Sequence, residues 1–292
     1  MKILLIGDTG QLGLSLKKRF KKTENLVSIS RKNIDLLVTD KIIKKIGFYN
    51  PDIIINAAGY TDVELAETEY QKSYSINSNA IERMAQYSYN NQTLFVHYST
   101  DYVFDGKKNE PYIETDKVNP INIYGKSKLE GEKKIINSKC KYIIFRTSWV
   151  YSSYGKNFPI NILNAAKNYD SLNIVKDQIG SPTHADFISL VTEKCIYKKK
   201  INSLYHLSSN GETSWFEFAK YIINGAKKRG CKFKCLENNI KPILSENSSA
   251  LALRPKNSLL NCDKIRNTCE IDIPKWQTHA DLFLDDYLGV SS

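Results

Sequence analysis

The chain has 292 residues, of which 41% are hydrophobic and 25% are charged, and its formal net charge is +11. This composition is typical of globular proteins and excludes collagen-like, fibrous and largely disordered chains. At ~150 residues per domain, the length predicts two domains. The apolar runs are far shorter than the ~18–20 residues of a membrane-spanning helix, and the N-terminus lacks a secretory signal pattern. We therefore expect a cytoplasmic protein without a membrane span.

The cysteines and the cations predict neither a metal site nor a nucleic-acid partner. The six cysteines lack the spacing of a disulfide framework, and Cys231 and Cys235 have neither the C-x₂-C spacing nor the second pair of a zinc site. The excess cations are mostly lysines in short runs, such as Lys17–Arg19 and Lys198–Lys200. Dispersed lysine is typical of solvated helix faces, although the positive field would also favour an anionic small molecule.

The first 148 residues alternate short apolar strands with helical patterns. We predict strands at 2–7, 26–30, 52–56, 94–99 and 142–147, and helices at 10–20, 70–90 and 123–136. Strands that are apolar on both faces and alternate with helices indicate an α/β fold with a Rossmann-type, doubly wound parallel sheet. We assign residues 1–148 to this domain.

After Trp149 the predicted elements become shorter, with turn residues at 180–182 and 210–211. A helix is expected at 214–226, because Ser214 and Glu217 have the spacing of a capping box. We therefore assign residues 149–292 mainly to a smaller α/β, substrate-binding region. Some of its segments are expected to return to the first domain.

A glycine-rich turn joins the first predicted strand to the first helix. It has the spacing G-x-x-G-x-x-G at Gly7, Gly10 and Gly13. Such a turn directs backbone N–H groups and the positive end of the helix dipole at a diphosphate, and side chains there would block the approach. The alternative is a turn that binds nothing. We predict a dinucleotide site that comprises Gly7, Thr9, Gly10, Gln11, Leu12 and Gly13.

The end of the second strand favours NADPH, with NADH as the alternative. An acid at this position would bind the ribose 2′-hydroxyl, whereas a cation accommodates a 2′-phosphate. Here the strand is followed by Arg31 and Lys32, and the next acid, Asp35, lies further on. The alternative is that both cations only face solvent and do not contact a cofactor. The predicted cofactor site is completed by Asp35, Leu36, Ala57 and Ala58.

Tyr124 and Lys128 have the spacing Y-x-x-x-K at the start of a predicted helix. Residues four apart share one helix face, and a nearby cation lowers the pKa of a phenol, so Lys128 is expected to activate Tyr124. Thr100 lies at the end of a predicted strand, on the ligand-binding edge of such a sheet. With a nucleotide turn, these residues could reduce a carbonyl: Tyr124 supplies the proton, Thr100 holds the oxygen, and the nicotinamide supplies the hydride.

In combination, these motifs resemble the extended short-chain dehydrogenases/reductases, and more narrowly the dTDP-4-dehydrorhamnose reductase family. S-T-D-Y-V-F-D-G at 99–106 and R-T-S-W-V-Y at 146–151 are the most specific matches. Further matching stretches lie at 7–13, 56–63, 120–132, 177–183, 205–207 and 254–261. The resemblance therefore extends over nearly the whole chain.

The resemblance implies NADPH-dependent reduction of the C4 keto group of a nucleotide-linked 6-deoxyhexose, a step in the synthesis of lipopolysaccharide or capsule precursors. It implies that Thr100 bonds the sugar carbonyl, Tyr124 is the acid, and Lys128 also holds the nicotinamide ribose. The implied substrate residues are Asp101, Tyr102, Trp149, Asn157 and Arg254. For Trp149 the competing interpretation is core packing, and for Arg254 it is a surface ion pair.

Alternatives to this function stay open. A reductase of another nucleotide-linked keto sugar would use the same residues. Relatives of the family also act as regulatory subunits of methionine adenosyltransferase, although such a role would not require Thr100, Tyr124 and Lys128. The family's metal-bridged dimer uses an acid where this chain has Ser15. A homodimer is therefore expected without a bridging metal.

Overall fold

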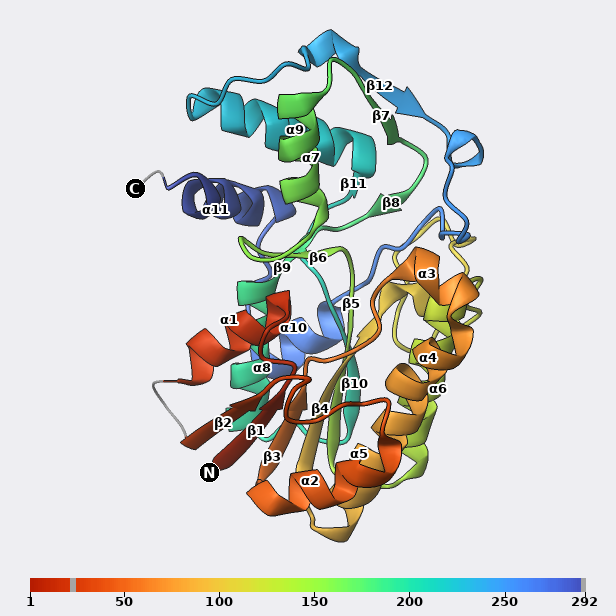
Figure 1. Ribbon diagram of the computed structural model, residues 1–292, viewed down its shortest axis with the longest axis vertical. Helices are drawn as coiled ribbons and strands as arrows, with labels where there is room; N and C mark the ends of the chain where they lie inside the picture. The colour runs from red at the N-terminus through yellow and green to blue at the C-terminus, as the bar shows by residue number, and fades with distance from the viewer. Residues whose placement is uncertain (22–24, 290–292) are drawn as a thin grey trace.

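The computed structural model describes residues 1–21 and 25–289, and its centre is a six-stranded sheet (Figure 1). The spatial order is β10-β5-β4-β3-β1-β2, and every neighbouring pair is parallel. The strands are β1 Lys2–Ile6, β2 Asn25–Ile29, β3 Ile53–Asn56, β4 Leu94–Thr100, β5 Tyr142–Thr147 and β10 Ser203–Leu207. The predicted Rossmann-type sheet is confirmed. Its strand order reverses between β1 and β3, where sheets of this kind form a ligand crevice.

Alternate side chains of each strand enter opposite cores, which explains why the strands are largely apolar on both faces. On one face, Ile3 and Leu5 pack with helices α1, α8 and α10. On the other face, Leu4 and Ile6 pack with helices α2, α5 and α6. These helices span α1 Gln11–Phe20, α8 Ala185–Tyr197, α10 Asp263–Cys269, α2 Ile42–Tyr49, α5 Ala80–Asn90 and α6 Ile123–Asn137.

The helix expected over 70–90 is interrupted. Its three parts are α4 Tyr70–Tyr74, a π-helical turn η2 at Ser75–Asn79, and α5. In the π turn the buried Asn77 side chain accepts from Tyr60 N at 2.9 Å and donates to Tyr60 O at 3.0 Å. It also donates to Ser127 Oγ at 3.0 Å. The extra residue of a π turn allows this inward placement, which ties the segment after β3 to the start of α6.

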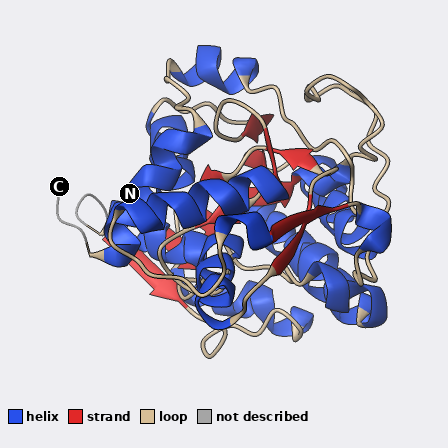
Figure 2. Cartoon of the chain, turned by 90° about the horizontal axis from the view of Figure 1, so that it is seen from above, coloured by secondary structure: helices blue, strands red, loops and turns tan. Residues whose placement is uncertain are grey.

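Most of the chain after Trp149 lies over the carboxyl edge of the sheet, as Figures 1 and 2 show. Tyr151, Phe218, Trp276 and Phe283 belong to a core separate from the two sheet cores. Ser214 Oγ accepts from Glu217 N at 3.1 Å, so the predicted helix start is confirmed. The helices of this part are α7 Phe158–Asn168, α9 Trp215–Lys228 and α11 Trp276–Leu288, and its short strands are β6 Val150–Tyr151, β7 Leu172–Val175, β8 Ile179–Gly180, β9 Thr183–His184, β11 Thr213–Ser214 and β12 Ile240–Ile243.

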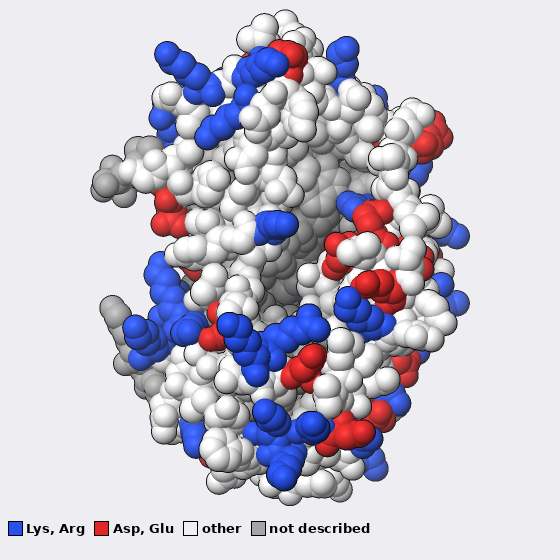
Figure 3. All heavy atoms as spheres, in the orientation of Figure 1, with Lys and Arg blue, Asp and Glu red and all other residues white. Residues whose placement is uncertain are grey.

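The remaining short helices connect these layers. They are η1 Thr39–Lys41, α3 Val63–Thr68, η3 Asp101–Val103, η4 Glu237–Asn239 and η5 Ser245–Asn247. In the space-filling view of Figure 3, the surface is hollowed between the sheet part and the part above it, with Lys and Arg side chains along the lower rim. Within the described chain, every helix is too short or too polar to cross a membrane.

Candidate active site

The glycine turn begins directly after β1 and leads into α1. A Cβ on Gly13 would lie 2.0 Å from Gly7 O, so only glycine permits this approach. Gly10 is the N-cap of α1 and provides no side chain to bond the N–H groups of the first turn. These N–H groups and the helix dipole are suited to an anionic group. The turn therefore fits the diphosphate of a dinucleotide.

Gln11 connects the glycine turn to the part of the chain above the sheet. Its Oε1 accepts from Asn157 Nδ2 at 2.9 Å and from Ser152 Oγ at 3.3 Å. Asn157 also caps α7, because its Oδ1 accepts from Ile160 N at 3.1 Å, and its Nδ2 donates to Ser152 O at 2.7 Å. The amide of Asn157 thus has protein partners on both sides. Its structural role is to hold α7 against the turn.

The remaining predicted cofactor residues follow β2 and β3. Arg31 is exposed and pairs with Asp35, with Nε 3.7 Å from Oδ1. Leu36 is buried in the core on the α2 side of the sheet. Ala57 and Ala58 lie beyond the end of β3, beside the glycine turn, where Ala57 N donates to Ile6 O at 2.9 Å. The ends of β1, β2 and β3 therefore form one edge around the crevice.

Thr100 and Asp101 lie at the carboxyl end of β4, where Thr100 pairs with Thr147 of β5. Thr100 Oγ1 donates to Asp101 Oδ1 at 2.9 Å and accepts from Tyr102 N at 3.2 Å. Ser148 Oγ donates to Asp101 Oδ2 at 3.0 Å. Burial raises the pKa of Asp101 to about 6, although hydrogen bonds to its carboxylate oppose the shift. Asp101 thus orients the hydroxyl of Thr100.

Tyr124 is placed beside this pair by the close approach of α6 to η3. A Cβ on Gly125 would lie 2.2 Å from Tyr102 O, which explains the glycine in the Y-G-K-S-K stretch. The rings of Tyr102 and Tyr124 meet edge to face, with centroids 5.9 Å apart. Burial raises the pKa of Tyr124 to about 12, while a hydrogen bond with Thr100 lowers it. The phenol is therefore protonated at neutral pH.

The amine of Lys128 lies on the sheet side of α6. Its Nζ donates to Tyr98 O at 2.5 Å and lies 3.3 Å from His97 Nε2. The lysine is 5% exposed, and burial lowers its pKa to about 8. The net shift of the Tyr124 pKa is upward, because burial outweighs the opposing interactions. The helix spacing is right, but the ammonium group is turned toward the sheet.

A buried ion pair supports the strand ends beneath these residues. Glu132 of α6 and Arg146 of β5 form two contacts, Nε to Oε1 at 2.9 Å and Nη2 to Oε2 at 2.7 Å. Their side chains are 2% and 5% exposed, and Ser99 Oγ donates to Glu132 Oε1 at 2.5 Å. The pair therefore fixes the residue directly before Thr100.

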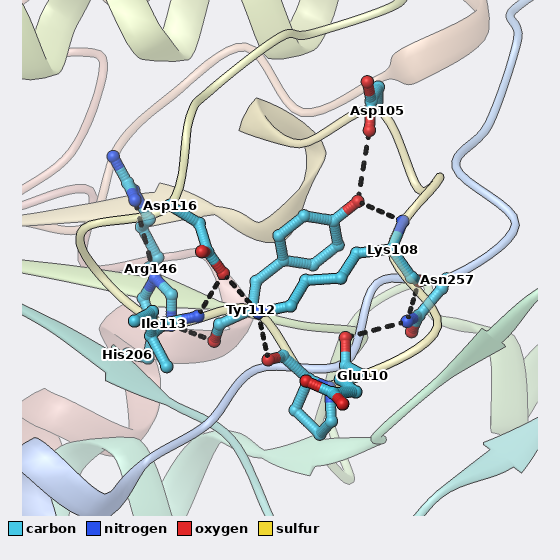
Figure 4. A network of polar contacts seen from close by, with 10 residues as sticks. Asp105, Lys108, Glu110, Tyr112, Ile113, Asp116, Arg146, His206 and Asn257 are labelled. Atoms are coloured by element: carbon cyan, nitrogen blue, oxygen red, sulfur yellow. Dashed lines mark hydrogen bonds and ion pairs between the residues drawn. The ribbon is translucent and has the colours of Figure 1, made fainter.

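The same arginine begins the polar network shown in Figure 4, which fixes the loop between η3 and α6. Arg146 Nη1 lies 3.4 Å from His206 Nε2, and His206 Nδ1 lies 2.9 Å from Tyr112 O. Asn257 Nδ2 donates to Lys108 O at 2.6 Å. Through these contacts the loop is held by both β10 and the segment near Arg254.

Trp149 follows β5 in a left-handed conformation, with a φ of +46°. Its half-buried ring stacks on Trp215 with centroids 3.5 Å apart and an interplanar angle of 6°. Trp215 Nε1 donates to Gln178 Oε1 at 3.1 Å. A Cβ on Gly180 would lie 2.5 Å from the Trp149 ring. The aromatic pair joins the strand ends to α9, so packing explains part of the role of Trp149.

Arg254 reaches the site from the segment before α10. Its Nη2 donates to Glu64 Oε1 at 2.7 Å, and Glu64 Oε2 accepts from Leu251 N at 2.7 Å. The Nε atom of Arg254 is buried and lacks a hydrogen-bond partner among the described residues. The predicted surface ion pair is thus present at this arginine.

Three functional contacts were absent from the sequence-based prediction. They are the side-chain contacts of Ser148 with Asp101, of His97 with Lys128, and of Glu64 with Arg254. Ser148 lies within the matching stretch 146–151 and His97 lies two residues before the stretch 99–106, so their proximity to these stretches was the available signal. Their partners depend on strand register and helix rotation, which the sequence pattern does not specify.

Comparison with known proteins agrees with this geometry over the whole chain. The sequence model of a family described as the RmlD substrate binding domain matches residues 1–288. A dTDP-4-dehydrorhamnose reductase of Sinorhizobium fredii is 37% identical over 285 residues, which cover 95% of this chain and 94% of the relative. That of Escherichia coli K12 is 34% identical and covers 98% of each chain. A crystal structure of the Bacillus anthracis dTDP-4-dehydrorhamnose reductase in complex with NADP has a TM-score of 0.91 at 33% identity, covering 98% of this chain and 99% of that one.

Proposed function

The chain belongs to the dTDP-4-dehydrorhamnose reductase family, and we propose that it reduces the C4 keto group of dTDP-4-dehydro-L-rhamnose to give dTDP-L-rhamnose, with NADPH. The observation that carries this proposal is the meeting of Thr100 and Tyr124 at the carboxyl end of β4. A protonated phenol and a hydroxyl beside the sheet crevice are suited to receive a carbonyl oxygen.

NADPH supplies the hydride when it is bound. Its diphosphate would lie against the first turn of α1, where Gly10 leaves the N–H groups free of side-chain caps. Tyr124 would donate its proton to the sugar oxygen as negative charge develops there. Its raised pKa keeps the phenol protonated at neutral pH, which is the form that a reduction requires. Lys128 would turn from Tyr98 O toward the nicotinamide ribose.

Thr100 would hold the carbonyl oxygen through its hydroxyl hydrogen. In the structure this hydrogen is directed at Asp101 Oδ1. It can be redirected by rotation about the Cβ–Oγ1 bond or by protonation of Asp101, whose pKa of about 6 lies near neutrality. Asp101 is therefore suited to orient Thr100, and Tyr102 to shield the phenol from water.

We propose that the nucleotide sugar lies between Trp149, Tyr102 and the segment at Arg254. The partly exposed guanidinium of Arg254, paired with Glu64, supports a role at the substrate diphosphate through its positive charge. Asn157 is less suited to contact substrate directly, because its amide already bonds Gln11, Ser152 and the start of α7. We propose that it positions the glycine turn.

The reaction is tested by following NADPH oxidation with a panel of nucleotide-linked keto sugars. We expect turnover with dTDP-4-dehydro-L-rhamnose at a kcat/KM at least about tenfold above that with UDP- and GDP-linked 4-keto sugars, since lost hydrogen bonds to a base cost ~1.4 kcal/mol or more. A preference for another keto sugar would favour the second candidate, a reductase with a different hexose. Cofactor binding without turnover of any keto sugar would favour a regulatory role.

NADPH is expected to be used better than NADH, and Arg31→Asp should reduce this preference. A charge-assisted contact with the 2′-phosphate is worth ~1.5–3 kcal/mol, which corresponds to about 10–100-fold in the ratio of the two kcat/KM values. Lys44→Asp, an equal charge change on the exposed face of α2, is the matched control. Equal kcat/KM values for the two cofactors in the unmodified protein would show that Arg31 does not select NADPH.

Trp149→Ala is expected to raise KM for the sugar nucleotide while the Kd of NADPH stays nearly unchanged. The ring stacks on Trp215 but stays half-exposed, and the proposal places substrate against its exposed part. Trp149→Phe, which keeps an aromatic ring, should restore most of the affinity. If Trp149 served only in packing, Trp149→Ala would lower the free energy of unfolding by ~3–5 kcal/mol. The affinities for cofactor and for substrate would then decline together. Thermal melting beside both titrations distinguishes the two results.

We also propose a homodimer that needs no bridging metal. Ser15, at the position of the family's acidic ligand, is only 2% exposed and offers no carboxylate to a cation. The mass in solution, measured by light scattering, should therefore be the same with and without a chelator of divalent cations. A chelator-dependent change from dimer to monomer would contradict this.

A further inference from the structure

A histidine without a part in the proposed reaction lies between the catalytic lysine and the edge of the cofactor crevice. His97 is in β4, 1% exposed, and pairs in register with Asn56 of β3. Its Nδ1 lies 3.3 Å from Asn56 Nδ2, and its Nε2 lies 3.3 Å from Lys128 Nζ. Asn56 continues the chain of contacts, because its Oδ1 accepts from Ala58 N at 3.2 Å. The four groups form one line, of which Lys128, His97 and Asn56 are buried and Ala58 is half-buried.

The backbone N–H of Ala58 fixes the direction of every bond in this line. An N–H only donates, so the oxygen of the Asn56 amide must face Ala58 and its NH₂ must face His97. His97 Nδ1 is therefore an acceptor. A neutral imidazole carries a single proton, which must then lie on Nε2.

The proton on Nε2 is directed at Lys128 Nζ. An ammonium group has three donors and no lone pair, so only the uncharged amine of Lys128 can accept this bond while donating to Tyr98 O. A charged Lys128 requires the opposite arrangement, in which Nε2 accepts and Nδ1 carries the proton. The Asn56 amide must then turn its oxygen toward His97, and Ala58 N loses its acceptor.

We propose that His97 is a positioning residue whose tautomer changes with the charge of Lys128, so that the lysine, the imidazole and the Asn56 amide switch together. The proposal rests on the proposed function in one respect, which is that Lys128 takes part in the reaction. When Lys128 takes up a proton, the switch removes the hydrogen-bond acceptor of Ala58 N, in the backbone after β3. That backbone is part of the cofactor site, because a Cβ on Gly7 of the glycine turn would lie 2.7 Å from Ala58 N.

The surrounding charges allow the lysine to titrate while the histidine stays neutral. Glu132, on the same helix as Lys128, favours the charged amine but is itself paired with Arg146 of β5. Tyr124, also on that helix, is neutral near pH 7, since burial raises its pKa. Burial, with the nearby charge of Lys128, holds the pKa of His97 well below its usual range. A change at His97 above neutral pH is therefore a change of tautomer and adds no proton to the ring.

Nitrogen NMR of the histidine rings tests the switch without any substrate. The chain has four histidines, and the His97 signals are identified by their loss in His97→Leu. The spectra are recorded from about pH 6 to about pH 10, roughly two units either side of the Lys128 pKa of about 8. We expect the Nδ1–H tautomer at the acidic end and the Nε2–H tautomer at the basic end. One unchanged tautomer across the range would overturn the proposal.

Two variants show whether the change is transmitted along the line. Lys128→Met removes the titrating group, so His97 should keep the Nε2–H tautomer at every pH. Asn56→Asp provides two acceptor oxygens, one for Ala58 N and one for His97, so His97 should keep the Nδ1–H tautomer. Unchanged signals of the other three histidines would show that each variant is folded. A tautomer change that persists in Lys128→Met would overturn the proposal.

A kinetic measurement separates the switch from a simple charge effect of the new carboxylate. Asn56→Asp should raise the apparent pKa in the pH profile of kcat by about one unit or more, because the charged lysine gains an acceptor at Nε2. In the His97→Leu background the same substitution should shift the pKa much less. Equal shifts in both backgrounds would mean that the charge acts through space and that His97 transmits nothing. The NMR result stands even if the sugar substrate proves to be a different one.

Discussion

Replacement of Tyr124 by phenylalanine should lower kcat by ~10²–10⁴-fold, the usual contribution of a positioned general acid. At 1.36 kcal/mol per tenfold, this is a loss of about 3–5 kcal/mol of transition-state stabilisation. The effect is large because the alkoxide that forms on the sugar loses the proton donor positioned beside it, while the proton of Thr100 is directed at Asp101. NADPH affinity should stay nearly unchanged, since the glycine turn is not altered.

The control for this variant is Tyr205→Phe, which removes a phenol from the sheet core at β10, far from the proposed chemistry. It should keep kcat close to the unmodified value. Single-turnover measurement of NADPH oxidation separates the chemical step from product release. A Tyr124→Phe enzyme that retains more than about a tenth of the kcat would contradict the general-acid role and leave Thr100 or water as the proton source.

Removal of Arg146 should have the largest effect on stability. Arg146→Met leaves the Glu132 carboxylate, with a side chain that is 2% exposed, without its bidentate partner. Breaking a buried pair in this way costs ~3–5 kcal/mol, because the remaining charge is uncompensated. The free energy of unfolding is measured by urea titration. A further loss of kcat is expected, since Glu132 also bonds Ser99 directly before Thr100.

The double variant Arg146→Met/Glu132→Leu distinguishes loss of a partner from loss of packing. Replacing both charges by apolar groups removes the uncompensated carboxylate, so most of the stability should return. If Arg146→Met alone cost less than about 1 kcal/mol, the pair would behave like a solvent-exposed salt bridge and our account of its burial would be wrong.

The sheet could be predicted from sequence because its signal is local. The predicted strand at 142–147 coincides with β5, and the end of the predicted strand at 52–56 coincides with that of β3. Both are apolar runs that enter cores on two faces. The π turn inside the expected helix at 70–90 could not be predicted in this way. It depends on Asn77 reaching Tyr60 and Ser127, which lie far away along the chain.

From the sequence, the candidate site could be proposed as a set of residues but not as a set of contacts. The helix period correctly places Tyr124 and Lys128 four residues apart at the start of α6, yet it does not show that Lys128 Nζ bonds Tyr98 O and meets His97. Whether the lysine faces the phenol or the sheet depends on the distance between α6 and β4. The approach of α6 to η3, directly after β4, is determined by Gly125 against Tyr102 O, a contact between separate segments.

The central claim is that the chain transfers a hydride from NADPH to the C4 carbonyl of the sugar. The most direct measurement uses NADPH deuterated at the transferring position, with dTDP-4-dehydro-L-rhamnose as the substrate, and locates the label in the product by NMR and mass spectrometry. We predict one deuterium, at C4 of the deoxyhexose, and a much slower appearance of the same product with Tyr124→Phe. Oxidation of NADPH that leaves the sugar unlabelled, or a label at any other carbon, would contradict the account.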